Sequence, residues 1–154
     1  MKTLILYASK YGAAKEIAQR IAKKIEGALV CDIKQKNLPA LSDFDCVIIG
    51  SSVYAGSLRS EAKAYAATYA GELSKKNLGL FISGFTEDDS YFAKNYPASL
   101  VQSAKAKGFF GGIYDPKKAN WFERFIVKIV AKESEYTDRI DNSKIEAFVE
   151  ALMK

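Results

Sequence analysis

Histidine is absent from the 154-residue sequence, and cysteine occurs only twice. A catalytic triad that uses a histidine base is therefore impossible. The two cysteines, Cys31 and Cys46, each lie in a short apolar run, where we expect buried and reduced thiols. Two thiols without a histidine are too few ligands for a zinc or iron–sulfur site, so we expect no bound metal.

The sequence also has no apolar run near the roughly 20 residues that a membrane-spanning helix requires. Met1 and Lys2 lead directly into a short strand-like run, so we expect no signal peptide and a cytoplasmic protein. The composition is that of a globular chain, with 49% hydrophobic and 27% charged residues. A length of 154 residues fits one domain, and we predict a single domain over 1–154.

The net charge of +5 is concentrated in one part of the chain. Between Lys105 and Lys132, seven Lys or Arg residues accompany two acidic ones, so this window accounts for the whole excess. Such a window indicates either an anionic partner or surface, or a solvated basic face. We expect no nucleic-acid partner.

Apolar runs of strand length alternate with helical patterns along the whole chain. The strand-like runs are 3–7, 28–33, 44–49, 78–82 and 107–114, and the last is interrupted by two glycines. The helical patterns cover 13–25, 58–70, 91–106, 118–131 and 144–153. Short, nearly all-apolar strands between helices indicate a parallel sheet covered on both faces. We therefore predict a doubly wound α/β fold with a ligand at the carboxyl ends of its strands.

The turn after the first strand, residues 9–14, leads directly into the first helix. Ile17, Ile21 and Ile25 recur every four residues and define one helical face. A turn from a parallel strand into a helix presents unpaired N–H groups and the positive end of the helix dipole. This turn is therefore predicted to bind an anion.

The predicted strand ends carry small hydroxyl residues, glycines and aromatic residues, without charged catalytic groups. Gly50 and Ser51 follow the third strand, where a phosphorylated receiver domain needs an aspartate. The P-loop, the dinucleotide fingerprint and the nucleophile elbow are missing. The first loop also lacks the cysteine of a small phosphatase of similar fold. A phosphate loop beside flat aromatic walls suits a planar cofactor with one phosphate, and FMN fits that description.

Residues 3–22 resemble the phosphate-loop signature of the flavodoxin family. In that family an apolar strand is followed by hydroxyl-x-hydroxyl-Gly-Asn-Thr and then a helix, and Ser9 and Gly12 match this pattern. The resemblance extends over the whole chain. It implies a flavodoxin-like, doubly wound sheet of five parallel strands in the order 2-1-3-4-5, with helices on both faces and one non-covalent FMN.

Three positions of the loop depart from the family signature. Tyr11, Ala13 and Ala14 stand where the family usually has Thr, Asn and Thr, so three side-chain contacts to the phosphate are expected to be lost. The backbone N–H groups do not depend on these side chains, and Lys10 or Lys15 is expected to supply charge instead.

Two further segments resemble a particular group within the fold, the menaquinone-dependent protoporphyrinogen dehydrogenases. Residues 50–56 are similar to the second flavin loop of that family, and residues 120–130 are similar to its aromatic and basic helix. We expect Tyr54 to form one wall of the isoalloxazine site. Phe85 and Tyr91 are candidates for the other wall, because aromatic rings offer a broad apolar surface with little rotamer freedom.

Ala55 and Gly56 are expected near flavin N5, where a glycine lets the peptide rotate when the flavin gains a proton. No residue is expected to act as a dedicated acid or base, because the redox chemistry belongs to the flavin. The predicted cofactor-binding residues are Ser9, Lys10, Tyr11, Gly12, Ala13, Ala14, Ser52, Val53, Tyr54, Ala55, Gly56, Ser83, Gly84, Phe85 and Tyr91.

The resemblance implies an oxidoreductase in which FMN takes electrons from a protoporphyrinogen-like substrate and passes them to a quinone. The alternative is an electron carrier that docks redox proteins and has no substrate of its own; a third possibility is a domain that has lost FMN and only binds partners. The predicted helix at 118–131 is apolar over about half its circumference. It is expected to pack on the sheet or on a partner subunit, to contact a membrane peripherally, or to form a wall beside a quinone or tetrapyrrole.

Overall fold

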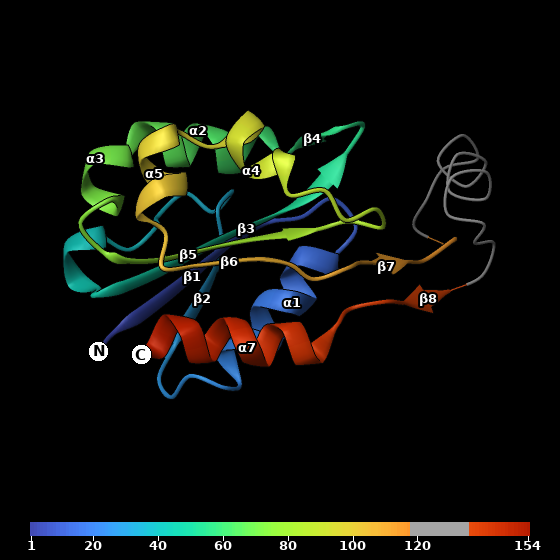
Figure 1. Ribbon diagram of the computed structural model, residues 1–154, viewed down its shortest axis with the longest axis horizontal. Helices are drawn as coiled ribbons and strands as arrows, with labels where there is room; N and C mark the ends of the chain where they lie inside the picture. Colours follow the sequence, from blue (N-terminus) through green and yellow to red (C-terminus); the bar gives the residue numbers. More distant parts are fainter. Residues whose placement is uncertain (118–135) are drawn as a thin grey trace.

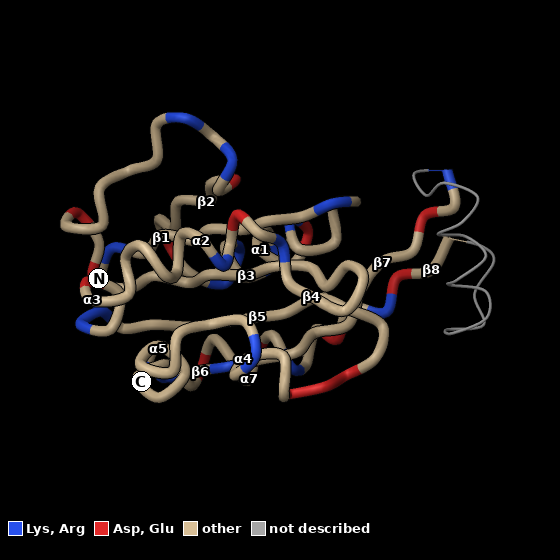
Figure 2. Tube along the Cα trace, turned by 90° about the horizontal axis from the view of Figure 1, so that it is seen from above, with Lys and Arg blue, Asp and Glu red and all other residues tan. Residues whose placement is uncertain are grey.

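The computed structural model describes residues 1–117 and 136–154, so the predicted helix at 118–131 lies outside the described residues. Five parallel strands form the main sheet in the order β2-β1-β3-β5-β6 (Figures 1 and 2). The predicted order 2-1-3-4-5 is thereby confirmed, since β5 and β6 are the fourth and fifth predicted strands. The strands are β1 (Thr3–Ala8), β2 (Leu29–Asp32), β3 (Cys46–Tyr54), β5 (Asn77–Ser83) and β6 (Ala106–Phe109).

Helices cover both faces of this sheet (Figure 1). One face carries α1 (Ala13–Ala22) and α7 (Asn142–Met153). The other carries α2 (Ser60–Thr68), α3 (Ala70–Leu73), α4 (Ser90–Asn95) and α5 (Ala98–Ser103), and a 3-10 turn, η1 (Leu41–Asp43), precedes β3. Among the residues that the structure describes, no helix is both long and apolar enough to cross a membrane.

Two hydrophobic cores lie between the sheet and its helices because side chains alternate along each strand. In β1, Leu4 and Leu6 face the core under α2 to α5, whereas Ile5 and Tyr7 face the core under α1 and α7. All six residues of β1 are buried, as expected for a central strand covered on both sides.

The segment after the third predicted strand differs from the prediction. Residues 50–54 continue β3 beyond the predicted end, and β4 (Ser57–Leu58) pairs antiparallel with it. Ala55 and Gly56 connect these strands with positive φ angles of 52° and 78°. A two-residue connection of this kind favours a tight hairpin whose twist matches its strands. The predicted second flavin loop is therefore the tip of a hairpin.

Two predicted helices are each divided into two shorter ones. The pattern at 91–106 is divided into α4 and α5 at Tyr96 and Pro97. Proline lacks a backbone N–H and moves the preceding residue out of the helical region, and Tyr96 accordingly has φ −113° and ψ 150°. The pattern at 58–70 is divided at Tyr69, where the backbone also leaves helical geometry.

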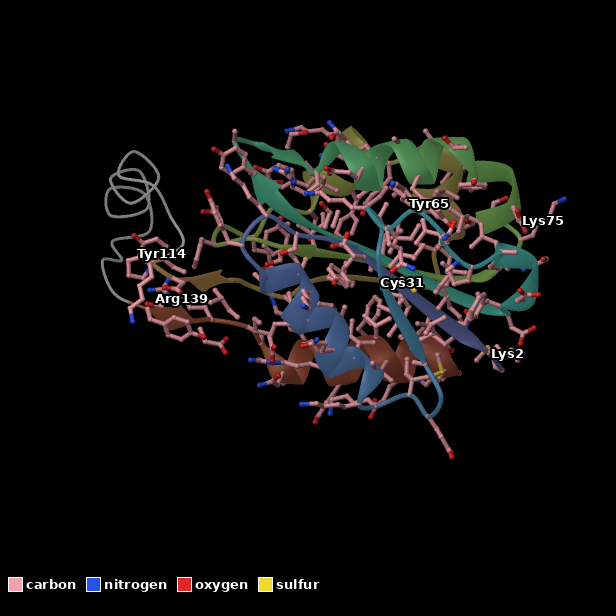
Figure 3. The ribbon with its side chains drawn as sticks, turned by 180° about the vertical axis from the view of Figure 1, so that it is seen from behind. Lys2, Cys31, Tyr65, Lys75, Tyr114 and Arg139 are labelled. Atoms are coloured by element: carbon pink, nitrogen blue, oxygen red, sulfur yellow. The ribbon has the colours of Figure 1, made fainter. Side chains whose placement is uncertain are left out.

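The last predicted strand is also interrupted. β6 ends at Phe109, and β7 (Ile113–Tyr114) pairs antiparallel with β8 (Thr137–Asp138) in a separate ribbon. This ribbon extends beyond the carboxyl ends of the main sheet (Figure 1), and Figure 3 labels Tyr114 and Arg139 in this part of the molecule. Asp141 caps the N-terminus of the final helix, since its carboxylate accepts hydrogen bonds from the N–H groups of Ser143 and Lys144.

Candidate functional site

A cavity of about 260 Å³ lies at the carboxyl ends of β1, β3 and β5. Five segments meet there: the loop after β1, the end of β3, the loop after β5, the start of α4 and the chain at the start of β7. The lining residues are Lys10, Tyr11, Ala13, Ser52, Val53, Tyr54, Ser83, Gly84, Phe85, Thr86, Tyr91, Gly112 and Ile113.

The structure brings most of the predicted site residues to this cavity, and their roles in binding stay predictions. Lys10, Tyr11, Ala13, Ser52, Val53, Tyr54, Ser83, Gly84, Phe85 and Tyr91 line it. Ser9, Gly12, Ala14, Ala55 and Gly56 belong to the same two turns and are not among the lining residues. Sequence reasoning missed Thr86, Gly112 and Ile113. The glycine pair that interrupts the last strand-like run was the available signal for the latter two.

The first loop is held by its own hydrogen bonds. Gly12 has a φ of 99°, which a side chain would oppose, and it caps the N-terminus of α1. Its N–H donates to the Ser9 hydroxyl at 2.8 Å, and the Glu16 N–H donates to the Gly12 carbonyl at 3.0 Å. Ser9 therefore supports the loop from within.

The N–H groups of Ala13, Ala14 and Lys15 precede the first hydrogen bond within α1, which is donated by Glu16. The Ala14 side chain is completely buried in the core beneath α1. Its contribution to a site is therefore limited to its backbone. The turn therefore has the N–H groups and the positive end of the helix dipole that an anion site requires, and anion binding itself stays a prediction.

Tyr54 lies at the hairpin tip and is 38% exposed. The Lys10 ammonium lies 3.3 Å from the centroid of the Tyr54 ring and 5.2 Å from that of Tyr11. The Arg59 guanidinium is 5.9 Å from the Tyr54 ring. Cation–π contacts therefore connect the first loop with the hairpin.

Hydrogen bonds from Asn95 fix the hairpin against α4. The Asn95 side-chain carbonyl accepts from the Ser57 hydroxyl at 3.1 Å, and its amide donates to the Tyr91 carbonyl at 2.9 Å. Tyr91 and Tyr54, two predicted ring walls, therefore belong to segments that are linked through one side chain.

The loop after β5 is attached to the chain before β7. The Ser83 hydroxyl and the Gly84 N–H both donate to the Gly111 carbonyl, at 2.9 and 3.0 Å. A Cβ atom on Gly84 would lie 3.0 Å from the Phe109 ring, so a side chain here would press on the core. This wall of the cavity is therefore built from backbone.

The donors and walls of the cavity fit a flat, polar-edged cofactor. The Ser52 hydroxyl is buried and has no hydrogen-bond partner among the described residues, which is uncommon for a buried polar atom unless a ligand supplies the partner. The residues that line the cavity include four aromatic ones, Tyr11, Tyr54, Phe85 and Tyr91. Of the described lining residues, only Lys10 carries a charged side chain.

Comparison with known protein families shows the family to which this chain belongs. The family model described as a flavodoxin domain matches residues 4–141, most of the chain. The chain belongs to the flavodoxin family. Members are flavoproteins, and FMN is the cofactor of this chain.

The individual relatives share only low sequence identity with this chain. The protoporphyrinogen IX dehydrogenase [quinone] of Escherichia coli strain K12 is 24% identical over 147 residues, which cover 87% of this chain and 81% of that protein. Oxidised flavodoxin 1 from Bacillus cereus shares the fold with a TM-score of 0.61 and 15% identity, over 99% of this chain and 97% of that one. A Lactobacillus acidophilus flavoprotein in complex with FMN has a TM-score of 0.52 and 18% identity, over 71% of this chain and 90% of that one.

Proposed function

We propose that this flavodoxin is a cytoplasmic oxidoreductase that passes electrons from a protoporphyrinogen-like substrate to a quinone. The observation that carries the proposal is the sign of the charge in the cavity. Among the described residues, Lys10 is the charged side chain that lines the cavity, whereas the acidic loop residues 87–89 do not line it. A positive charge favours the negatively charged, reduced form of a flavin, which suits a protein that must accept electrons from an organic substrate.

The residues at the strand ends would divide the work of holding FMN. The backbone at the start of α1, with Lys10, would hold the phosphate. Tyr54 would form one wall of the ring site and Tyr91 or Phe85 the other. Bound FMN supplies the electron and hydride chemistry, and the protein orients it and excludes water.

The polar edge of the ring would meet groups of β3 and its hairpin. The Ser52 hydroxyl offers an unused donor and acceptor at that edge. The peptide between Ala55 and Gly56 would lie near the proton-accepting nitrogen of the ring. Among the described lining residues none is an acid or a histidine, so the proposal assigns no side chain the role of proton donor.

An electron carrier between redox proteins is the second candidate. It is favoured by the likeness of the fold to a flavodoxin over 99% of this chain and 97% of that one. In this case the exposed edge of the ring site would dock a redox protein directly.

Absorbance and FMN titration test the cofactor first. Purified protein should be yellow or should bind added FMN, and Gly12→Val should abolish binding while the far-UV circular dichroism of the sheet is kept. The reason is the φ of 99° at Gly12, which a β-branched residue resists. A colourless protein that binds no added FMN would contradict both redox candidates, and retained affinity in the variant would show that the loop is misassigned.

Anaerobic assays then separate the two candidates. The dehydrogenase should oxidise protoporphyrinogen in the presence of a quinone, with the rate depending on both substrates. Fast one-electron exchange with redox proteins and no turnover with any quinone would leave the carrier.

A further inference from the structure

Lys10 and Tyr54 are in direct contact across the proposed ring site. The distance from the Lys10 nitrogen to the ring centroid is 3.3 Å, shorter than the roughly 3.5–4.0 Å of an ordinary carbon–carbon contact. Both side chains line the same cavity. No atom of another molecule fits between them while this contact exists.

The face of Tyr54 that Lys10 covers therefore cannot also stack on a flat ring. We propose that Lys10 and the flavin ring compete for this face of Tyr54, and that the phosphate of the ligand decides the competition. The inference rests on the proposed FMN site and identifies Lys10 as the residue that makes the site selective for a phosphorylated flavin.

The position of Lys10 in the chain explains why a phosphate would matter. Lys10 lies on the loop that leads through Gly12 into α1, where the N–H groups of residues 13–15 precede the first hydrogen bond within the helix. A phosphate at this helix end draws the ammonium toward itself by charge attraction. FMN thus replaces the cation–π contact that its ring removes.

Riboflavin has the same ring and no phosphate, so it must displace Lys10 without this compensation. An exposed cation–π contact of this kind corresponds to about a 2–5-fold effect on affinity. Loss of a charge-assisted contact to the phosphate is expected to weaken FMN by about tenfold. Because both flavin rings displace Lys10, the cation–π contribution cancels in the ratio of FMN affinity to riboflavin affinity, and Lys10→Met should lower this ratio by about tenfold.

The test compares Lys10→Met with Lys15→Met in fluorescence titrations with FMN and with riboflavin at one ionic strength. Lys15 is exposed on the first turn of α1, so its loss removes the same charge near the same helix end. Lys10→Met should bind riboflavin about 2–5 times more tightly and FMN more weakly. Lys15→Met should weaken FMN and leave riboflavin unchanged. Equal changes for both flavins in Lys10→Met, or weaker riboflavin binding, would overturn the inference.

A measurement on flavin-free protein separates this inference from the FMN assignment. With ¹³C-labelled lysine, the ring current of Tyr54 should shift the Lys10 side-chain methylene protons upfield of those of Lys15. Tyr54→Leu and saturation with FMN should each remove the shift. Identical Lys10 and Lys15 signals in flavin-free protein would refute the competition even if FMN binds well. If neither FMN nor riboflavin binds, the FMN assignment is refuted whatever the spectrum shows, and the proposed selectivity for a phosphorylated flavin is refuted with it.

Discussion

The β3–β4 hairpin contains an unusual backbone conformation that a pair of substitutions can measure. Ala55 and Gly56 form its two-residue connection, and both have positive φ angles. Glycine adopts this conformation without strain, but an L-residue with a Cβ is penalised by roughly 1–2 kcal/mol. Asparagine is the preferred non-glycine residue at the first position of such a turn. Ala55→Asn should therefore stabilise the fold, and Gly56→Ala should destabilise it.

The surroundings of the turn allow the magnitudes to be worked out from the backbone alone. A Cβ atom on Gly56 would have no other atom within 4 Å, so Gly56→Ala adds strain without a clash. Lower entropy of the unfolded chain offsets this strain by about 0.4–1 kcal/mol, which leaves a loss of roughly 0.5–1.5 kcal/mol. We expect Ala55→Asn to gain roughly 0.5–1 kcal/mol. For a chain of this size, about 1 kcal/mol corresponds to a shift of about 2–4 °C in Tm.

Urea unfolding of flavin-free protein, followed by circular dichroism, measures both variants without a contribution from ligand binding. The midpoint should rise for Ala55→Asn and fall for Gly56→Ala, with the slope of the transition unchanged. A lower midpoint for Ala55→Asn, or an unchanged one for Gly56→Ala, would refute the assignment of this turn.

Three further predictions concern the core and the surface. Gly50→Ala should destabilise the protein by about 2 kcal/mol or more in urea unfolding, because the new Cβ would lie 1.9 Å from the buried Phe81 ring. Arg20→Gln should lower Tm at pH 7, but by less than a substitution in the core does, and this decrease in Tm should be smaller at pH 3. Burial raises the pKa of Asp138, but hydrogen bonds from a backbone amide and from Arg20 outweigh burial, so the pKa in the folded protein is below its ordinary value. The Asp138 carboxylate therefore stabilises the fold above about pH 3.9, and this stabilisation is lost as pH falls through the folded-state pKa. Burial raises the pKa of the Cys46 thiol to about 11, so Ellman's reagent at pH 8 should label it only after unfolding, and rapid labelling of native protein would contradict its burial.

The parts of the fold that sequence reasoning predicted well are encoded by contiguous residues. The first strand, its turn and α1 follow from an apolar run, a glycine and isoleucines repeated every four residues, and the structure places them within a few residues of the prediction. The strand order followed from family resemblance, because alternating strands and helices alone leave several orders possible.

The parts that were missed depend on pairing between distant segments or on a local break. The pairing of β7 with β8 joins residues 113–114 to 137–138, and no local pattern encodes such a contact. The hairpin at Tyr54 was overlooked because β3 continues past the core, where its residues are only partly buried and lose the apolar pattern. Pro97 was a readable signal for the break between α4 and α5, since proline disfavours helix at the residue before it.

The structure shows where two of the three departures from the family signature in the first loop lie, namely Tyr11 and Ala14. The Ala14 side chain is buried beneath α1, and the backbone of the turn supplies the N–H groups. Tyr11 and Lys10 instead form part of a cation–aromatic cluster with Tyr54. In the proposed FMN site, the Lys10 charge would take the place of neutral hydroxyl and amide donors and would serve both the phosphate and the ring of the cofactor. On this proposal, cofactor affinity, flavin selectivity and the charge in the cavity depend on the same side chain, so a substitution of Lys10 should alter all three properties together.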